Sequence, residues 1–362
     1  MNAAGADAGF RSDEMTLHGV SGVCGPEGCT KDSYGVLAES MRLRHENFLQ
    51  CHTSLKRRMQ ATIPYRPATT PLVGVQLQAG EPVIWVKLEF LNPSGSTKDR
   101  IARFILEKAR REGRLDQETT VIEASSGSTS IAMALVCAQL GVRFIAVMPE
   151  GVSNERTLMI KAFGGEIRLT PRAGGIAGAI AETERLAKEM KAFLPKQFAN
   201  EDNALAHRMG TAREIMEQLP AKNVDAVVSG VGTGGTLVGL YEGLADSGCT
   251  PLGVLAKPIT FQGEIECCSF SGKIPGVVDS ISTIFRVGRL ARLETIEVED
   301  HDALAVSREL GRLGFPVGPS SGLNYCAAVE ISKKLGRDST VVTVFPDRME
   351  RYFTTELFAP YR

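Results

Sequence analysis

From residue 67 onward, short apolar runs alternate with longer segments in which apolar residues recur every three or four positions. A short apolar run between turn residues is typical of a buried strand, and the wider spacing is typical of a helix with one face on the core. We therefore predict strands at residues 71–77, 82–90, 119–123, 143–148, 166–170, 224–229, 251–256 and 340–345. The helices that we predict between them cover residues 99–113, 131–140, 153–163, 176–192, 237–245 and 323–336.

The alternation of strands and helices indicates the fold class. It predicts an α/β fold with twisted, mostly parallel sheets that are covered by helices on both faces. A chain of 362 residues is long enough for two lobes. We predict an N-terminal lobe over residues 61–200 and a C-terminal lobe over residues 201–362.

Two stretches lack a clean period. Residues 1–60 are mixed in composition, and we predict a partly disordered N-terminal extension there. Within it, residues 41–60 are compatible with an amphipathic helix that lies on the body or on a dimer partner. Residues 260–281 are irregular and contain glycines and a proline, so we predict a long functional loop near a cleft.

Lys98 has the most informative local context. It lies in the segment NPSGSTKDR, residues 92–100, between a predicted strand and a predicted helix. The N-terminus of a helix disfavours a cation, because the helix dipole is positive there. A lysine whose pKa is lowered by burial and positive potential can react as a neutral amine and form a Schiff base with an aldehyde.

Two further loops follow the same order of strand, loop and helix. Residues 124–130, ASSGSTS, offer hydroxyls and backbone N–H groups at a helix N-terminus, which can bind a carboxylate. Residues 230–236, GVGTGGT, let the backbone approach an anion closely and are suited to a phosphate. The second loop lacks the Gly-Lys-Ser/Thr ending of a nucleotide-binding P-loop.

A fourth turn, GPSSG at residues 318–322, places small hydroxyls before the last predicted helix. One ligand would use all four features, namely pyridoxal 5′-phosphate (PLP) that carries an amino acid. The lysine would bind its aldehyde, one loop its phosphate and the other loop the carboxylate of the amino acid, with the neutral hydroxyl as a further partner. We therefore predict PLP as the cofactor.

These motifs resemble those of the cysteine synthase and cystathionine β-synthase family, the fold type II PLP enzymes. The resemblance runs from about residue 65 to residue 358 and includes residues 197–211 and the tail FPDRMERY at residues 345–352. It implies a two-lobed fold like that of the tryptophan synthase β subunit, and a homodimer. It implies Lys98 as the catalytic, Schiff-base lysine. The substrate would be bound by Ser125, Ser126, Gly127 and Thr129. The cofactor would be bound by Lys98, Ser128, Gly232, Thr233, Gly234, Gly235, Thr236 and Ser320.

The resemblance also implies a reaction, PLP-dependent β-replacement on an activated serine. The donor would be O-phosphoserine or O-acetylserine, and a sulfur nucleophile, sulfide or thiosulfate, would add to an aminoacrylate and give cysteine or S-sulfocysteine. The alternatives are β-elimination, as in cysteine desulfhydrases and serine/threonine dehydratases, and cystathionine β-synthesis. A catalytically silent binding or regulatory relative is a further alternative of another class.

The chain departs from the family's usual residues at three positions. Ser128 stands where an Asn that binds the cofactor's phenolic oxygen is usual, Ser130 replaces a glycine, and Lys257 precedes Pro258 where Glu-Pro is common. We expect Lys257 and Lys273 near the cleft, with Arg208 and Arg213 near the lobe junction. A cleft cation would favour a dianionic leaving group, so we predict that O-phosphoserine is used at least as well as O-acetylserine.

Composition and charge narrow the remaining choices. A net charge of −1 argues against a nucleic-acid partner. The absence of a long apolar run and of a signal-peptide core predicts a cytoplasmic protein without membrane contact. The eight cysteines suggest reduced thiols, and the Cys24–Cys29 pair lacks a second Cys pair, so we predict no metal site.

Overall fold

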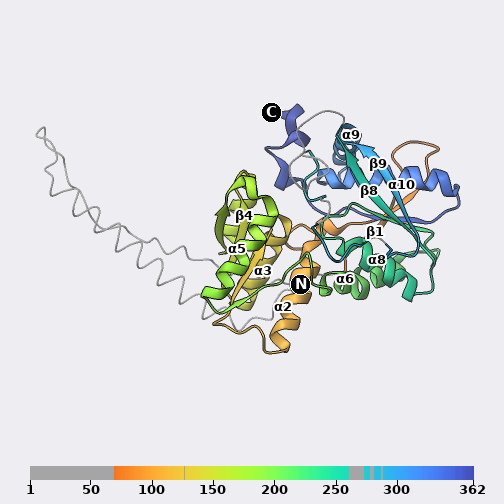
Figure 1. Ribbon diagram of the computed structural model, residues 1–362. Helices are drawn as coiled ribbons and strands as arrows, with labels where there is room; N and C mark the ends of the chain where they lie inside the picture. The colour runs from red at the N-terminus through yellow and green to blue at the C-terminus, as the bar shows by residue number, and fades with distance from the viewer. Residues whose placement is uncertain (1–68, 126, 261–272, 278–280, 287) are drawn as a thin grey trace, which may run out of the picture. The chain divides into compact units, whose positions relative to one another are not determined.

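The computed structural model describes residues 69–125, 127–260, 273–277, 281–286 and 288–362. These residues form two β-sheets, one of six strands and one of four (Figure 1). The predictions for residues 1–60, for Ser126 and for most of residues 260–281 lie outside the described residues.

The larger sheet combines strands from both ends of the described chain. Its order is β1 (Leu72–Val75), β2 (Ile84–Lys87), β10 (Val341–Val344), β7 (Ala226–Ser229), β8 (Leu252–Ile259) and β9 (Leu293–Glu299). β1 and β2 are antiparallel, and every other pairing is parallel, with Val342 beside Trp85 on one side and Val227 on the other. Two strands expected in the N-terminal lobe therefore belong to this sheet, and β2 pairs directly with β10 from the C-terminal half of the chain.

Both faces of the larger sheet are buried, as expected for a parallel sheet. On one face Ala226 and Val228 belong to the core that includes α9 (Asp300–Arg312) and α10 (Pro319–Leu335). On the other face Val227 packs in the core built by three helices, namely α6 (Asp202–Ala206), α7 (Ala212–Gln218) and α8 (Gly235–Asp246). A π-helical segment, His207–Thr211, joins α6 to α7.

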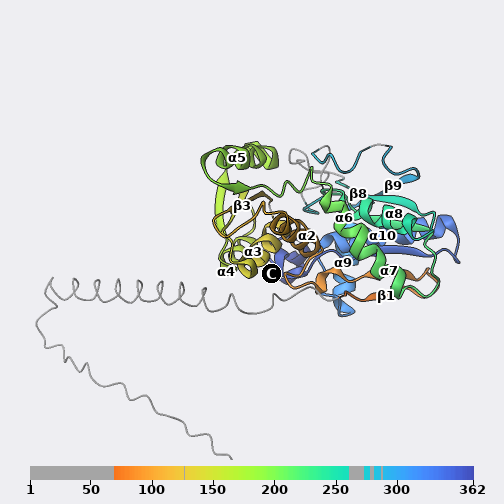
Figure 2. The same ribbon diagram turned by 90° about the horizontal axis from the view of Figure 1, so that it is seen from below.

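The smaller sheet is entirely parallel. Its order is β5 (Glu166–Thr170), β4 (Phe144–Pro149), β3 (Thr120–Ala124) and β6 (Ala192–Phe193). One face packs against α2 (Lys98–Arg111), α3 (Ser128–Leu140) and α4 (Asn154–Ala162). The other face packs against α5 (Gly175–Glu189), which lies on the opposite side of β3 from α3 and α4 (Figure 2).

The predicted elements are present, with differences at several places. The strand expected at residues 82–90 ends at Lys87 and continues as a 3-10 helix, Glu89–Leu91. The helix expected to reach residue 192 ends at Glu189, and residues 192–193 form the short β6. α6, α7, β9 and α9 were not predicted. β9 gave a weak signal because it is an edge strand that buries only Ile296 and Val298 among charged neighbours. The remaining 3-10 helices are Arg172–Gly174, Met349–Tyr352 and Glu356–Tyr361.

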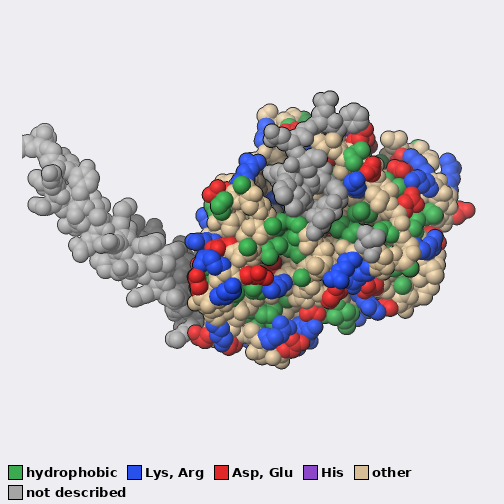
Figure 3. Space-filling model, viewed as in Figure 1, with side chains coloured by type: hydrophobic (Ala, Val, Ile, Leu, Met, Phe, Trp, Pro, Cys, Tyr) green, Lys and Arg blue, Asp and Glu red, His purple; other side chains and the backbone are tan. Residues whose placement is uncertain are grey.

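Lysine and arginine side chains alternate with acidic ones over the face shown in Figure 3, without a broad patch of one sign. Among the described residues, no helix has both the length and the apolar character needed to cross a bilayer.

Candidate active site

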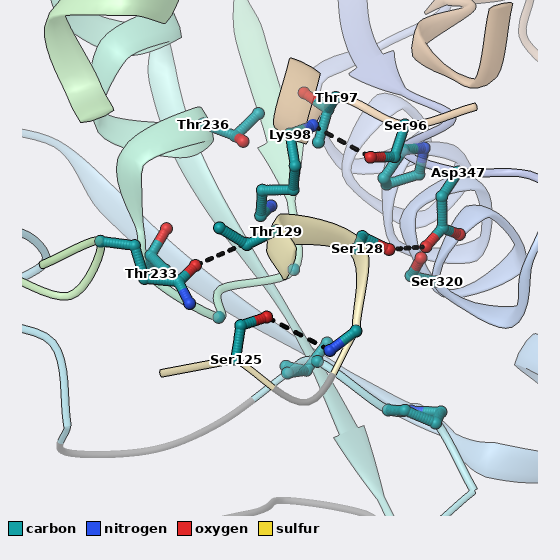
Figure 4. Close-up of a pocket in the computed structure, with 18 of the residues that line it drawn as sticks. Ser96, Thr97, Lys98, Ser125, Ser128, Thr129, Thr233, Thr236, Ser320 and Asp347 are labelled. Atoms are coloured by element: carbon teal, nitrogen blue, oxygen red, sulfur yellow. Dashed lines mark hydrogen bonds between the residues drawn. The ribbon is translucent and has the colours of Figure 1, made fainter. Parts of the chain in front are cut away.

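One pocket lies at the carboxyl ends of strands from both sheets (Figure 4). The segments that follow β2, β3, β7 and β10 line it, together with the first turn of α10. Ligands of α/β proteins bind at this end of parallel strands, because the loops there converge and helix N-termini point inward. The pocket brings together most of the predicted site residues, namely Lys98, Ser125, Gly127, Ser128, Thr129, Gly232, Thr233, Gly234, Thr236 and Ser320.

Lys98 is the first residue of α2, and its side chain faces the pocket (Figure 4). Loss of hydration there lowers the pKa of its amine below the usual value, although the negative charges of Asp347 and Glu89 oppose the shift. The backbone N–H of Lys98 donates to Ser96 Oγ at 3.2 Å. The result is an amine that gives up its proton more readily than an ordinary lysine.

The loop before Lys98 is held by buried polar groups. The Asp99 carboxylate accepts bonds from the backbone N–H of Ser94 at 2.6 Å and from the Ser94 hydroxyl. Arg351, which is 1% exposed, donates to the carbonyl oxygens of Gly95 and Ser94. Gly95 has a φ of +81°, and a Cβ there would lie 2.9 Å from Arg348 Nε. The C-terminal segment therefore fixes the turn that presents Lys98.

A buried ionic network lies beneath α2. The Arg100 guanidinium bonds both oxygens of Glu89, at 2.6 and 2.7 Å, and both oxygens of Glu214, at 2.7 and 2.8 Å. Lys87, fully buried on β2, pairs with Glu214 at 2.9 Å. Burial alone would raise the pKa of Glu89, but the Arg100 charge lowers that pKa to about 2. The network joins β2, α2 and α7 and fixes the start of α2.

The glycine loop, residues 230–236, leaves no room for side chains at three positions. A Cβ on Gly232 would overlap the carbonyl oxygen of Gly276, and one on Gly235 would overlap the Asn203 side chain. Gly234 has a φ of +80°, and its Cβ would collide with Phe285. The loop ends where α8 begins, so uncovered backbone N–H groups and a helix dipole face the pocket. This cradle fits a phosphate group.

Two hydroxyl groups of the glycine loop contact side chains of the segment 203–207. Asn203 Nδ2 donates to Thr233 Oγ1 at 2.9 Å, and His207 Nε2 lies 3.3 Å from Thr236 Oγ1. Burial lowers the pKa of His207 to about 3, so its imidazole is neutral. Gly235 is the one predicted cofactor residue of this loop that is not among the described residues that line the pocket.

The serine-rich loop, residues 124–130, leads into α3, which begins at Ser128. Ser125 Oγ accepts from the backbone N–H of Gly127 at 3.2 Å and of Ser130 at 3.4 Å. The Thr129 hydroxyl donates to Gln197 Oε1 at 2.6 Å, and Gln197 Nε2 donates to the Ala124 carbonyl at 2.8 Å. Gln197 lines the pocket and was not predicted as a site residue.

Ser128 has a partner that the sequence did not indicate. Its hydroxyl donates to Asp347 Oδ2 at 3.0 Å, and the Tyr352 hydroxyl donates to the same oxygen at 2.8 Å. Burial raises the pKa of Tyr352, so this hydroxyl keeps its proton. Ser128 thus bonds across the pocket to the C-terminal segment, and its predicted contact with the cofactor remains a prediction.

Ser320 is the second residue of α10 and lines the pocket near Asp347 (Figure 4). One turn later, Asn324 accepts from the Gly230 N–H at 2.7 Å and donates to the Val344 carbonyl at 2.9 Å. α10 is therefore bonded both to the glycine loop and to β10. This arrangement holds a neutral hydroxyl at a defined place in the wall.

The basic residues expected near the cleft and near the lobe junction are not part of the described pocket lining, although Lys273 lies two residues before Pro275, which is part of it. Lys257 pairs with Glu297 across β8 and β9 at 2.7 Å, Arg208 pairs with Asp246 at 2.5 Å, and Arg213 pairs with Glu217 at 3.3 Å. Neither these three residues nor Lys273 are among the described residues that line the pocket. The guanidinium on the wall belongs instead to Arg156 of α4.

Together these residues fit PLP that carries an amino acid. Lys98 can bind the aldehyde, the side-chain-free glycine loop can hold the phosphate, and Ser320 can face the ring. The serine-rich loop can hold the carboxylate of the amino acid.

Comparison with known proteins gives the class. Residues 64–347 match the family described as pyridoxal-phosphate dependent enzyme. The chain is 37% identical to a cysteine synthase of Staphylococcus aureus over an alignment of 289 residues, which covers 76% of this chain and 89% of that protein. It is 40% identical to cysteine synthase B of Campylobacter jejuni over 285 residues, 76% of this chain and 92% of that protein. The chain therefore belongs to the pyridoxal-phosphate-dependent enzyme family.

Solved structures agree with this assignment. The O-acetylserine-dependent cystathionine β-synthase of Helicobacter pylori matches with a TM-score of 0.72 and 32% identity over 83% of this chain and 98% of that one. A hydrogen sulfide-producing enzyme of Fusobacterium nucleatum matches with a TM-score of 0.70 and 34% identity over 79% and 97% of the two chains. An O-ureido-L-serine synthase matches with a TM-score of 0.71 and 31% identity over 83% and 94%. The predicted fold class and cofactor are confirmed.

Proposed function

We propose that this enzyme catalyses β-replacement on an activated serine, O-acetylserine or O-phosphoserine, with a sulfur nucleophile. With sulfide the product is cysteine, and with thiosulfate it is S-sulfocysteine. The proposal is carried by one observation: Lys98, the glycine loop, the serine-rich loop and Ser320 line the same pocket. The likeness to two cysteine synthases supports the donor class.

Each part of the pocket has a role in this reaction. When bound, PLP withdraws electrons from the Cα of the amino acid. Lys98, with its lowered pKa, accepts the proton from Cα and can return it. Ser125, Gly127 and Thr129 hold the donor carboxylate at the N-terminus of α3. Ser320 is a neutral partner that does not favour a protonated ring nitrogen, and this favours loss of a group from Cβ over transamination.

A product-identified assay tests the proposal. The purified, PLP-loaded enzyme is incubated with each donor and with sulfide, thiosulfate or homocysteine, and the products are identified by mass spectrometry. We expect cysteine or S-sulfocysteine from at least one donor. Pyruvate and ammonia as the only products, with every nucleophile present, would contradict β-replacement.

A second candidate is β-elimination that releases hydrogen sulfide. Two structures similar to this one, at 31% and 34% identity, are of hydrogen sulfide-producing enzymes. The same Lys98 base and carboxylate loop would serve that reaction with cysteine as the substrate. Sulfide release from cysteine without any donor separates the two candidates, because replacement needs a second substrate and elimination does not.

Two further proposals concern the state of the enzyme in the cell. We propose a homodimer, which the family resemblance of the sequence implies, in the cytoplasm, which the composition of the sequence led us to expect. Light scattering during size-exclusion chromatography tests the dimer, and fractionation of cells tests the compartment. A monomer at micromolar concentration would contradict the first.

A further inference from the structure

Three charged side chains occur among the described residues that line the pocket, namely Lys98, Asp347 and Arg156. The first two have roles or partners already described, since Lys98 is the proposed Schiff-base lysine and Asp347 accepts bonds from Ser128 and Tyr352. Arg156 has no assigned role. It is 8% exposed, so its guanidinium is largely removed from bulk water at the pocket wall.

The Arg156 guanidinium is held in a defined place. Its central carbon lies 5.3 Å from the centre of the Tyr352 ring, a cation–π distance. The ring is itself fixed, because its hydroxyl donates to Asp347 at 2.8 Å. The first turn of α4 is also fixed, since the neighbouring Glu155 accepts from the backbone N–H of Thr354 at 2.9 Å and from its hydroxyl at 3.2 Å.

Arg156 also lies beside the serine-rich loop. A Cβ on Gly127 would be 3.4 Å from both Cδ and Nε of Arg156. The side chain therefore passes over the backbone of Gly127, close to the proposed carboxylate-binding groups. The distance is an ordinary van der Waals contact, so the arginine side chain packs directly on the loop.

We propose that Arg156 binds an oxyanion of the donor amino acid and so helps to select anionic donors. The proposal rests on the proposed function. The oxyanion is either the donor's carboxylate or the phosphate of O-phosphoserine, which share the geometry that a guanidinium bonds with two parallel N–H groups. A partly desolvated guanidinium gives such a bond more strength than an exposed cation would.

The test measures donor binding and turnover separately. Wild type, Arg156→Gln and Arg156→Lys are titrated with O-acetylserine and with O-phosphoserine, each as the PLP-loaded enzyme without nucleophile, and the dissociation constants are read from the cofactor absorbance. KM values with sulfide are measured in parallel. Arg172→Gln is the matched control, because Arg172 is an exposed arginine of the following 3-10 helix. We expect the control to bind both donors as wild type does.

For Arg156→Gln we expect donor binding to weaken by about ten- to a hundredfold, the usual range for one lost charge-assisted bond. Equal weakening for both donors assigns the carboxylate, and a larger loss for O-phosphoserine assigns the phosphate. Partial recovery in Arg156→Lys supports a role of the charge itself. Unchanged binding of both donors in Arg156→Gln overturns the proposal. Equal weakening of donor binding in Arg156→Lys and Arg156→Gln also overturns it.

Two further measurements distinguish a loss of donor binding from a structural effect of the substitution. The melting temperature and the cofactor absorbance of Arg156→Gln should equal those of wild type. If they fall, competitive inhibition by inorganic phosphate is compared between wild type and Arg156→Lys, and equal inhibition overturns the proposal. Failure of the proposed function looks different, since wild type would then bind a donor without forming a sulfur-containing product.

Discussion

The pKa values of Lys98, which is half-buried in the pocket wall, and of the buried Glu123 are both shifted by loss of hydration, in the direction that favours the neutral form. Burial lowers the pKa of Lys98 and raises the pKa of Glu123 to about 8. Glu123 precedes the serine-rich loop, and its carboxyl group accepts from the backbone N–H groups of Ala124 at 3.1 Å and Gln197 at 3.4 Å. These bonds oppose the shift but do not reverse it. A neutral Lys98 can act as a base or form a Schiff base, whereas a neutral Glu123 avoids a buried charge next to the serine-rich loop.

The first prediction concerns Lys98. We expect Lys98→Ala to fold normally, because the lost side chain makes no structural ion pair among the described contacts, and to lose both the Schiff-base absorbance and turnover. Absorbance spectra, circular dichroism and the β-replacement assay check this. Turnover at the wild-type rate would remove Lys98 from the mechanism, and the absence of cofactor colour in wild type would revive a catalytically silent role.

The second prediction concerns the pH dependence of stability. Because the pKa of Glu123 is about 8 in the folded protein and near its usual 4.5 in the unfolded chain, the folded state alone holds this proton between those values. The stability that results is complete below pH 4.5 and is lost as pH rises to about 8. The loss is at most about 1.4 kcal/mol per pH unit.

Glu123→Gln removes this dependence, because glutamine stays neutral. Its melting temperature, relative to wild type, should therefore rise steadily between pH 5 and pH 8. Glu118→Gln, at an exposed position before the same strand, should show no such trend. A constant difference between Glu123→Gln and wild type over this range would show that Glu123 is ionised in the folded protein.

At the scale of elements, helices are fixed where they meet the pocket by buried polar contacts as well as by apolar packing. α2 starts over the Arg100 network, and α8 starts at a glycine loop that presses against Phe285 and Gly276. Removing one member of a buried ion pair leaves an uncompensated charge, whereas an exposed pair of the same geometry contributes little.

The third prediction compares two arginines that each bond a carboxylate through two nitrogens. Arg100→Leu leaves Glu89 buried without its cation and leaves Glu214 paired with Lys87 alone, and we expect a loss of about 3–5 kcal/mol in the free energy of unfolding. Arg143 bonds Glu166 at 2.6 and 2.7 Å on the surface, and we expect Arg143→Leu to cost about 0–1 kcal/mol. Urea unfolding measures both, and similar losses would contradict the role given to burial.

The fourth prediction compares two glycines with positive φ. Gly234, at +80°, faces Phe285, whereas Gly113, at +71°, has open space where a Cβ would be. Both alanine variants should pay a backbone strain of about 1–2 kcal/mol. Only Gly234→Ala should also weaken PLP binding, because its Cβ displaces the loop. Equal cofactor affinity in the two variants, measured by titration of the apoenzyme, would place the phosphate elsewhere.

At the scale of the whole molecule, the pocket is shared by the two sheets. Lys98 and the serine-rich loop begin helices that pack on the smaller sheet, and the glycine loop and Ser320 begin helices on the larger one. A ligand that contacts both groups of elements stabilises them together, because it binds the folded state alone.

The fifth prediction is that removing PLP lowers the melting temperature and that adding it back restores the wild-type value. At a hundred times its dissociation constant, PLP should add about 2.7 kcal/mol to the free energy of unfolding. Pyridoxal, which lacks the phosphate, should stabilise less if the glycine loop holds the phosphate. Differential scanning calorimetry checks both, and equal stabilisation by the two compounds would contradict that role of the loop.

The sequence by itself determined the features that depend on neighbours along the chain. The strand–loop–helix order around Lys98, the glycine loop and the serine-rich loop followed from apolar spacing and turn residues, and so did most strands and helices. Combined with the family resemblance, they were enough to predict the fold class and PLP, both of which are confirmed.

Only the tertiary structure decided which distant residues share the pocket. Gln197, Asp347 and Tyr352 lie in segments that contribute to the family resemblance but were not predicted as site residues, and all three line the pocket. Arg156 places a guanidinium in the described pocket wall, whereas Lys257, one of the two lysines expected near the cleft, pairs with Glu297 on the neighbouring strand. The physical reason is that spacing along the chain specifies local structure, whereas membership of a pocket depends on which strand ends become neighbours when the sheets form.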